Sequence, residues 1–377
     1  MRLKDIGTIV TGNTPSKKNN EYYESNDILF IRPSDIEENY ITLLEDSEEY
    51  ISEKAREKAR ILPEGAVLVT CIGTIGKVGI LKKEATCNQQ INAIIPNDKV
   101  ISKYLAYLMQ SKQKLLQLKA NAPVVPIINK TDFSEMEINI CDIDEQKKIV
   151  EQLDLLKTII DKRKKQIEEL QNILKSQFVE MFGDPVSNNL NWNILKMSEL
   201  GTLERGTSKH RPRNAPELLG GIYPLIQTGD VSNSGLYITD YKSTYSELGL
   251  KQSKMWRKDT LCITIAANIA QTSILTFDAC FPDSVVGFIT NALVNNIFIH
   301  YWFGFLQKNI DAQATQVAQK NINLKVLNNL DVIVPPIELQ NQFADIVKQI
   351  DKQKFEIEKS LKEMQELYES LMEKYFG

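Results

Sequence analysis

Two long stretches of the chain repeat apolar residues with the spacing of a coiled-coil helix. Within Ile149–Met181 the apolar positions alternate steps of four and three residues, and only Arg163 and Gln177 interrupt them. Within Phe343–Tyr375 the same register recurs, with Lys354 as its polar break. Both stretches lack glycine and proline, so each predicts one long amphipathic helix.

Each predicted helix measures about 57 Å, at 1.5 Å per residue, and cannot hide its apolar face alone. We expect the two helices to pack on each other in an antiparallel pair. The alternative is that each helix folds back onto its own globular unit. The predicted helix-pairing residues are Ile149, Leu153, Leu156, Ile160, Ile167, Leu170, Leu174, Phe343, Val347, Ile350, Ile357, Leu361, Met364 and Leu371.

The segments before the two helices have a different pattern. Short β-rich runs bounded by Gly, Pro, Asn and Asp predict strands, and one helix is expected over Ser102–Leu118. The predicted strands of the first segment are Ile28–Ile31, Ala66–Ile72, Ile91–Ile95 and Met136–Ile140. These segments therefore predict globular units of mixed helix and sheet.

The chain repeats itself at an offset of about 194 residues. Gly7 and Gly12 recur as Gly201 and Gly206, Gln146 recurs as Gln340, and Phe182-Gly183 recurs as Phe376-Gly377. A repeat of this length is too long for a solenoid unit of roughly 20–50 residues, so it indicates a duplicated domain with its helix. Two such copies in one chain predict a pseudo-two-fold arrangement.

These patterns together predict an α+β fold in which two globular α/β-mixed domains are joined by two long helices packed as an antiparallel coiled coil. The predicted parts are globular domain 1 at residues 1–143, helix 1 at 144–183, globular domain 2 at 184–335 and helix 2 at 336–377.

Composition narrows the class of protein. The formal net charge is −4, which by itself argues against a nucleic-acid binder, since these usually carry a basic excess. Five scattered cysteines without CxxC spacing indicate reduced thiols and a cytoplasmic protein. The first residues carry no apolar signal segment, and no uncharged run approaches the ~20 residues of a membrane span, so no membrane association is expected.

Catalytic motifs are not found in the sequence. There is no P-loop and no GxGxxG after a predicted strand, and Val334-Pro-Pro-Ile lacks the polar residue of an adenine-methyltransferase motif. The sequence has only two histidines, His210 and His300, which argues against a His-based triad or a His-rich metal site. We therefore expect a non-enzymatic protein without a cofactor or metal.

The basic residues are unevenly placed, and their concentration in two loops indicates DNA binding despite the negative net charge. Arg205–Arg213 contains four Arg or Lys residues among nine, and Gly12–Lys18 is the milder counterpart in the first copy. Such loops can neutralise phosphates, and arginine can bridge guanine O6 and N7. A solvated surface loop is the alternative for each.

Other candidates follow predicted strands or supply amide groups that can bind adenine. Arg32 and Ser34 follow Ile28–Ile31, and Gln227 and Thr228 hold the matching place in the second copy. The complete set of predicted DNA-binding residues is Thr14, Lys17, Lys18, Arg32, Ser34, Lys77, Asn88, Gln89, Gln90, Arg205, Lys209, His210, Arg211, Arg213, Gln227, Thr228, Gln271 and Lys320.

The order of globular unit, long helix, globular unit and long helix resembles the specificity subunit of a type I restriction-modification system. Recurrent patterns carry the resemblance: Leu3-Lys-Asp-Ile-Gly-Thr with its echo Met197-Ser-Glu-Leu-Gly-Thr, Gly73-Thr-Ile-Gly-Lys-Val-Gly-Ile80, Gln319-Lys-Asn-Ile322 and Val334-Pro-Pro-Ile-Glu-Leu-Gln340. The second copy departs from the first where Gly73, Gly76 and Lys77 become Ala267, Ala270 and Gln271.

The resemblance implies that each globular unit is a target recognition domain for one half of a bipartite, asymmetric sequence in double-stranded DNA. It also implies that the helices set the spacer and dock two methyltransferase (modification) subunits, with restriction (translocase) subunits joining that complex. Two alternatives remain open at this point: a two-headed coiled-coil scaffold that binds proteins, and a silent copy that donates recognition domains by recombination.

Overall fold

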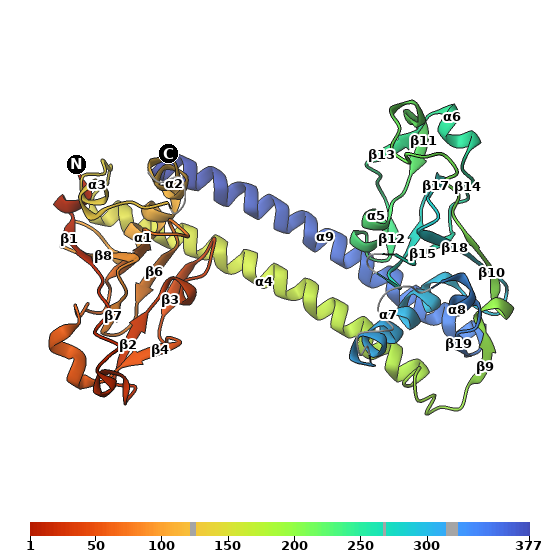
Figure 1. Ribbon diagram of the computed structural model, residues 1–377, viewed down its shortest axis with the longest axis horizontal. Coiled ribbons are helices and arrows are strands. Elements are labelled where there is room, and N and C mark those ends of the chain that lie inside the picture. The colour runs from red at the N-terminus through yellow and green to blue at the C-terminus, as the bar shows by residue number, and fades with distance from the viewer. Residues whose placement is uncertain (121–125, 267–268, 314–322) are drawn as a thin grey trace. The chain divides into compact units, whose positions relative to one another are not determined.

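The computed structural model describes residues 1–120, 126–266, 269–313 and 323–377, and Figure 1 shows its elements along the chain. The chain divides into two compact units. Unit 1 comprises Met1–Lys164 and Lys359–Gly377, and unit 2 comprises Lys165–Glu358. Both boundaries fall inside the long helices, so each unit contains a globular part together with segments of both helices.

The globular part of unit 1 is built on two sheets. The larger sheet has the order β1-β8-β5-β6-β3, and the smaller has the order β4-β2-β7. The strands are β1 (Gly7–Thr11), β2 (Ile28–Ile31), β3 (Ile41–Leu44), β4 (Glu49–Ile51), β5 (Val67–Thr70), β6 (Val78–Leu81), β7 (Ala85–Cys87) and β8 (Ile91–Pro96).

The central strands of unit 1 are buried on both faces, and their sequences are continuous apolar runs for that reason. Every residue of β5 and β6 is buried, and Val67 of β5 lies opposite Ile80 and Ile94. Helix α1 (Ser102–Ser111) packs its buried residues, among them Tyr104 and Leu108, into the same core.

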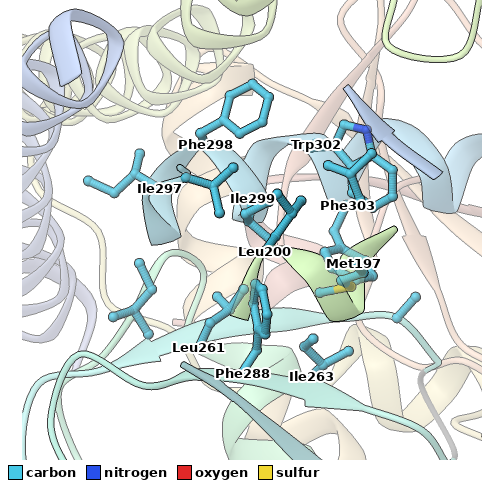
Figure 2. Close-up of a cluster of buried hydrophobic side chains, with 14 of the residues drawn as sticks. Met197, Leu200, Leu261, Ile263, Phe288, Ile297, Phe298, Ile299, Trp302 and Phe303 are labelled. Carbon is cyan, nitrogen blue, oxygen red and sulfur yellow. The ribbon is translucent and has the colours of Figure 1, made fainter. Parts of the chain in front are cut away.

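Unit 2 repeats this arrangement. Its larger sheet has the order β10-β18-β15-β16-β12, strand for strand the counterpart of the larger sheet in unit 1. Figure 2 shows its core, where Met197, Leu200, Leu261 and Phe288 lie against buried residues of α7 (Asn296–Gln313) such as Phe298. The strands are β9 (Asn193–Lys196), β10 (Gly201–Arg205), β11 (Leu219–Leu225), β12 (Tyr237–Ile238), β13 (Ser243–Tyr245), β14 (Met255–Trp256), β15 (Leu261–Thr264), β16 (Thr272–Leu275), β17 (Ala279–Cys280), β18 (Val285–Thr290) and β19 (Asp331–Val334).

Short helices complete the two units. In unit 1 these are α2 (Gln113–Lys119) and α3 (Lys130–Ser134), and in unit 2 they are α5 (Thr228–Asn233), α6 (Glu247–Lys251) and α8 (Leu324–Asn328).

The long helices are α4 (Ile143–Phe182) and α9 (Ile337–Phe376), and they pack antiparallel, as predicted. In unit 1 the Tyr375 hydroxyl, near the end of α9, donates to Gln152 Oε1, near the start of α4, at 2.7 Å. In unit 2 the ring of Phe343, near the start of α9, lies 5.4 Å from that of Phe178, near the end of α4. The start of each helix therefore lies beside the end of the other.

The predicted helix-pairing residues differ in how deeply they are covered. Five of them are buried as members of the globular cores: Ile149, Leu153, Leu174, Phe343 and Val347. Leu156 and Ile160, further along α4, are also buried. The remainder stay partly exposed: Ile167, Leu170, Ile350, Ile357, Leu361, Met364 and Leu371.

Phenylalanine residues at the C-terminal ends of the long helices, which are not part of the heptad pattern, anchor these helices in the globular cores. Phe178 and Phe182 at the end of α4 are fully buried in the core of unit 2, and Phe376 at the end of α9 is buried in the core of unit 1. Phe376 packs on Tyr104 of α1 with ring centroids 5.1 Å apart. Each globular core is therefore completed by the helix that starts in the other copy.

Two predictions for unit 1 were wrong. The single helix expected over Ser102–Leu118 is broken at Lys112, whose backbone leaves helical geometry and whose ammonium group donates to the Phe376 carbonyl. The strand expected at Met136–Ile140 is reduced to a bridge between Glu137 and Arg2. In unit 2 the corresponding β19 pairs with all of β9, whereas in unit 1 the backbone hydrogen bonds join only Met1 to Ile138 and Leu3 to Met136.

Candidate nucleic-acid interface

A glycine starts the candidate loop in each unit because the backbone passes very close to a neighbouring turn. A Cβ on Gly12 would lie 2.1 Å from the Asn88 carbonyl oxygen, and one on Gly206 would lie 2.3 Å from the Phe281 carbonyl oxygen. Only glycine permits such an approach. The loops after β1 and β10 therefore leave their sheets at equivalent places, each over the turn that follows β7 or β17.

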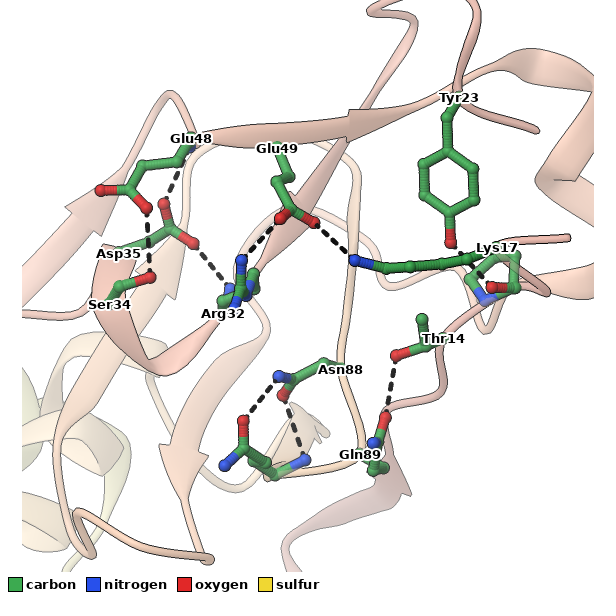
Figure 3. A network of polar contacts seen from close by, with 12 residues as sticks. Thr14, Lys17, Tyr23, Arg32, Ser34, Asp35, Glu48, Glu49, Asn88 and Gln89 are labelled. Atoms are coloured by element: carbon green, nitrogen blue, oxygen red, sulfur yellow. Dashed lines mark hydrogen bonds and ion pairs between the residues drawn. The ribbon is translucent and has the colours of Figure 1, made fainter. Parts of the chain in front are cut away.

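In unit 1 the loop and the turn are joined by polar side chains (Figure 3). The Thr14 hydroxyl donates to Gln89 Oε1 at 2.8 Å. Asn88 is buried, and its side chain closes the turn by accepting from the Gln90 N–H at 3.0 Å and donating to Gln90 Oε1 at 2.9 Å. Gln89 is exposed, so its side chain, and not that of Asn88, is placed to meet a ligand.

Tyr23 fixes the far end of this loop. Its hydroxyl donates to the Pro15 carbonyl at 2.7 Å. Burial, and secondly the nearby Glu49 carboxylate, raises the pKa of Tyr23, so the phenol stays protonated and remains a donor at neutral pH.

The turns after β2 and β11 share one cap. The Arg32 N–H donates to Asp35 Oδ2 at 2.6 Å, and the Gln227 N–H donates to Asp230 Oδ2 at 2.8 Å. An acceptor three residues on satisfies a backbone donor that the turn leaves unpaired. Arg32 and Gln227, which were predicted to be equivalent, thus occupy the same position of the same turn.

Lys77 and Ser34 both contact this part of unit 1. The Lys77 ammonium donates to the Pro33 carbonyl at 3.1 Å, and this hydrogen bond stabilises the turn after β2. The Ser34 hydroxyl donates to Glu48 at 3.3 Å. Lys77 is therefore engaged in holding the turn that carries Arg32.

A carboxylate lies among the basic residues of unit 1. Glu49 on β4 lies 2.5 Å from Arg32 Nη1 and 3.9 Å from Lys17 Nζ (Figure 3). Lys18, the next residue of the loop, is exposed. The local charge of this surface is thus lower than the basic residues alone would give.

Unit 2 gathers three arginines around the turn that follows β17. Arg213 Nη2 lies 2.5 Å from Asp283 Oδ1, and Arg211 Nη2 lies 3.7 Å from Asp283 Oδ2. Arg205 Nε donates to the Asp283 carbonyl at 2.8 Å. The three arginines predicted for unit 2 therefore meet at one residue, Asp283, which itself was not predicted.

Further contacts order the same loop of unit 2. Gln252 Oε1 accepts from the backbone N–H groups of Lys209 at 2.7 Å and His210 at 3.1 Å. Arg211 Nη1 donates to the Ser208 carbonyl at 2.6 Å. A cavity of 260 Å³ lies beside these contacts and is lined by Ser208, Arg213, Asn214, Leu219, Leu225, Gln227, Thr228, Tyr245, Pro282 and Ser284.

Two predicted residues stand apart from this group. Gln271 keeps the turn of its counterpart Lys77, since the Gln271 N–H donates to Thr264 Oγ1 at 3.1 Å, as the Lys77 N–H donates to Thr70 Oγ1 at 3.0 Å. Lys320 lies outside the described residues.

Three acidic residues of the two sites were not predicted: Asp35, Glu49 and Asp283. Asp230 was noted beside Gln227 and Thr228 at the strand end of the second copy, but not as the acceptor of a turn. One signal was available: Asp35 and Asp230 each follow, by three residues, the candidate at the strand end.

In the described part of the chain, no helix is both long and apolar enough to cross a bilayer. The same residues contain no group of three or more His, Cys, Asp or Glu side chains able to hold a metal ion.

The family described as the type I restriction modification DNA specificity domain matches residues 1–172 and 189–367. The chain belongs to this family.

Relatives match over the whole chain or over one half of it. The type I restriction enzyme MjaIX specificity subunit of Methanocaldococcus jannaschii is 25% identical over 399 residues, which cover 99% of this chain and 91% of the relative. The EcoR124I/EcoR124II specificity subunit of Escherichia coli is 31% identical over 194 residues, which cover 46% of this chain and 47% of the relative.

Solved structures share the fold. The S subunit of a type-I restriction-modification system from M. genitalium gives a TM-score of 0.61 at 15% identity, covering 100% of this chain and 95% of that one. A chain from a study of complex assembly and conformational transition of the type I R-M system gives 0.64 at 16% identity, with coverage of 100% and 96%. The predicted fold class is confirmed by this likeness.

Proposed function

We propose that this chain is the DNA sequence-specificity subunit of a type I restriction-modification complex. The observation that carries the proposal is the membership of both halves in the specificity family, together with equivalent polar loops in both units. Each unit is a target recognition domain that binds one half of a bipartite, asymmetric target in double-stranded DNA.

The recognition surface of unit 1 consists of the loop after β1, the turn after β2 and the turn after β7. The exposed amide of Gln89 and the partly exposed guanidinium of Arg32 carry the hydrogen-bonding groups that base edges require: an amide matches adenine, and a guanidinium matches guanine. In unit 2 the equivalent surface carries Arg211, Arg213 and Gln227. Because the exposed side chains differ, the two units bind different half-sites.

The acidic groups at these surfaces lower the expected affinity for DNA. Phosphate contacts supply most of the non-specific affinity of DNA-binding proteins, and Glu49 and Asp283 offset several of the cations that would make them. A chain with a net charge of −4 is therefore expected to bind DNA weakly by itself. Its partner subunits add further phosphate contacts.

The helices α4 and α9 are assigned two roles. They set the number of base pairs between the half-sites, and they dock two methyltransferase subunits, to which restriction (translocase) subunits are added. The chain itself is non-catalytic, and methylation and cleavage belong to the partners. The sequence contains no methyltransferase or P-loop motif, in agreement with this assignment.

Methylome sequencing of cells with and without the gene tests the proposal. We expect one bipartite N6-methyladenine motif to disappear when the gene is deleted and to return when it is restored. An unchanged methylome, in cells where the methyltransferase partner is expressed, would refute the function.

A further inference from the structure

Each recognition surface contains one carboxylate that contacts two basic side chains. In unit 1 Glu49 lies 2.5 Å from Arg32 and 3.9 Å from Lys17, which come from different loops (Figure 3). In unit 2 Asp283 lies 2.5 Å from Arg213 and 3.7 Å from Arg211, which come from one loop. Both carboxylates remain about one third exposed, at 33% and 32% of the side chain.

These carboxylates do not come from equivalent positions of the repeat. Glu49 belongs to β4, whereas Asp283 belongs to the turn after β17, where unit 1 has Gln89. Gln89 still holds the neighbouring loop, by accepting from Thr14. The two copies therefore place a carboxylate beside two cations by means of residues at different positions of the repeat. A contact inherited from one ancestral unit would use the same position in both copies.

We infer that Glu49 and Asp283 are positioning residues that fix the direction of the cationic side chains, so that sequence discrimination rises at the cost of general affinity for DNA. The inference rests on the proposed function. It explains how a surface with several arginines can belong to an acidic protein.

An arginine whose guanidinium lies against a carboxylate loses less side-chain freedom on binding, and its remaining N–H groups stay available for a guanine. The same carboxylate cancels a positive charge and repels nearby phosphates, which weakens binding to any sequence. Removal of the carboxylate is therefore expected to move affinity and discrimination in opposite directions.

The test uses the full chain assembled with its methyltransferase subunits and a double-stranded DNA library randomised in both half-sites. For Asp283→Asn we expect binding to unrelated duplexes to become several-fold tighter and more salt-dependent. We expect discrimination at one half-site to fall by about tenfold, the value of one bidentate contact. For Glu49→Gln we expect the same changes with the loss confined to the other half-site.

Matched controls remove the same charge from exposed residues outside these contacts. Glu217→Gln in unit 2 and Glu38→Gln in unit 1 are expected to leave discrimination unchanged. Asp283→Glu keeps the charge and is expected to retain most of the discrimination. Thermal unfolding of each variant separates misfolding from a change in recognition, and Asp283→Gln, which places in unit 2 the residue that unit 1 has there, replaces Asp283→Asn if the latter unfolds.

The outcomes distinguish the inference from the function on which it rests. Wild-type complex without any sequence preference would overturn the proposed function. Wild-type preference together with unchanged discrimination in the Asp283 and Glu49 variants would overturn the inference alone. A uniform loss of affinity across all sequences would do so too, since it would mean that the carboxylates only maintain the fold.

Discussion

Gln146 makes the same three hydrogen bonds in unit 1 that Gln340 makes in unit 2. Gln146 Oε1 accepts from the Ile101 N–H at 2.9 Å, and its Nε2 donates to the Lys99 and Cys141 carbonyls, both at 2.9 Å. Gln340 Oε1 accepts from the Asn295 N–H at 3.1 Å, and its Nε2 donates to the Leu293 and Pro335 carbonyls at 3.0 and 2.8 Å. Both side chains are fully buried, so each ties the first turn of a long helix to the segment that precedes α1 or α7.

Replacement of Gln146 by leucine should therefore destabilise unit 1. The change removes the partners of one N–H and two carbonyl groups that are partly buried, and we expect a loss of about 3 kcal/mol in the free energy of unfolding. Urea unfolding followed by circular dichroism measures it. Gln171→Leu, at an exposed position of the same helix, is the control and should change the free energy by less than about 0.5 kcal/mol. Equal effects of the two substitutions would contradict the role of the buried bonds.

Phe376 and Phe355 lie on the same helix in opposite environments. Phe376 is 3% exposed in the core of unit 1, whereas Phe355 is 64% exposed. Phe376→Ala is expected to cost about 3–5 kcal/mol, because it empties a packed site beside Tyr104. Phe355→Ala should have almost no effect on the unfolding transition. Calorimetry measures the unfolding temperature and enthalpy of both variants. A Phe376→Ala variant as stable as the wild type would show that the end of α9 does not contribute to the core of unit 1.

Ala270 occupies a backbone conformation that favours glycine. Its φ is +60°, and its counterpart Gly76 has φ +87°. Both N–H groups donate across the same turn at 2.9 Å, to Thr264 and Thr70 respectively. Ala270→Gly should relieve the strain and stabilise unit 2 by roughly 0.5–1 kcal/mol.

The reciprocal variant, Gly76→Ala, should destabilise unit 1, because the added methyl group also meets Gln113. Thermal unfolding of the two variants shows whether each substitution raises or lowers the stability. A destabilising Ala270→Gly change would mean that the alanine side chain contributes more packing than its backbone costs.

Asp351 on α9 is a half-buried carboxylate. Its Oδ2 lacks a hydrogen-bond partner, and burial raises the pKa of Asp351, an effect that Lys354 opposes. A carboxyl group with a raised pKa binds more protons in the folded state, so stability falls as pH rises through that pKa. Asp351→Asn is therefore expected to stabilise the protein by about 1 kcal/mol at pH 7 and to give no gain near pH 4.

Denaturant unfolding at the two pH values tests the Asp351 prediction. Asp345→Asn, which removes an exposed charge that pairs with Lys348 on the same helix, should give a small loss at pH 7. A gain from Asp351→Asn that is the same at both pH values would exclude titration of this group as the cause.

The length of the helix pair is expected to determine the spacer between half-sites. Insertion of seven residues after Arg163 and seven after Leu361 preserves the heptad register, and lengthens the pair by about 10 Å. That distance corresponds to about three base pairs of B-form DNA. Methylome sequencing should show a spacer longer by that amount with both half-sites unchanged, and an altered half-site with the old spacer would refute the mechanism.

The long helices were the most predictable part of the fold. A heptad pattern reports the helix and its packed face together, so Leu153 and Phe343 were found from spacing alone. Phe182 was noted only as a recurrence, because its burial depends on the core of unit 2 and not on the helix period. The strand expected at Met136–Ile140 was wrong, because an alternating pattern does not show how far another segment pairs with it.

The candidate site was predictable only in part. Basic loops at equivalent positions could be found from composition and repeat, and the structure places Arg205, Arg211 and Arg213 around one turn. Their carboxylate partner is some seventy residues further along the chain, and no local pattern connects it to them. Pairing across that distance is set by the sheet, which brings the loop after β10 over the turn after β17.

The position of Phe376 has a consequence for how the chain folds during synthesis. The strands and α1 of unit 1 emerge from the ribosome first, but the aromatic ring that closes their core is added almost 200 residues after Phe182, its equivalent in the first helix. At translation rates of 5–20 residues per second, unit 1 waits about 10–40 s with an open apolar site. Unit 1, the first to be synthesised, is therefore the last whose core is completed.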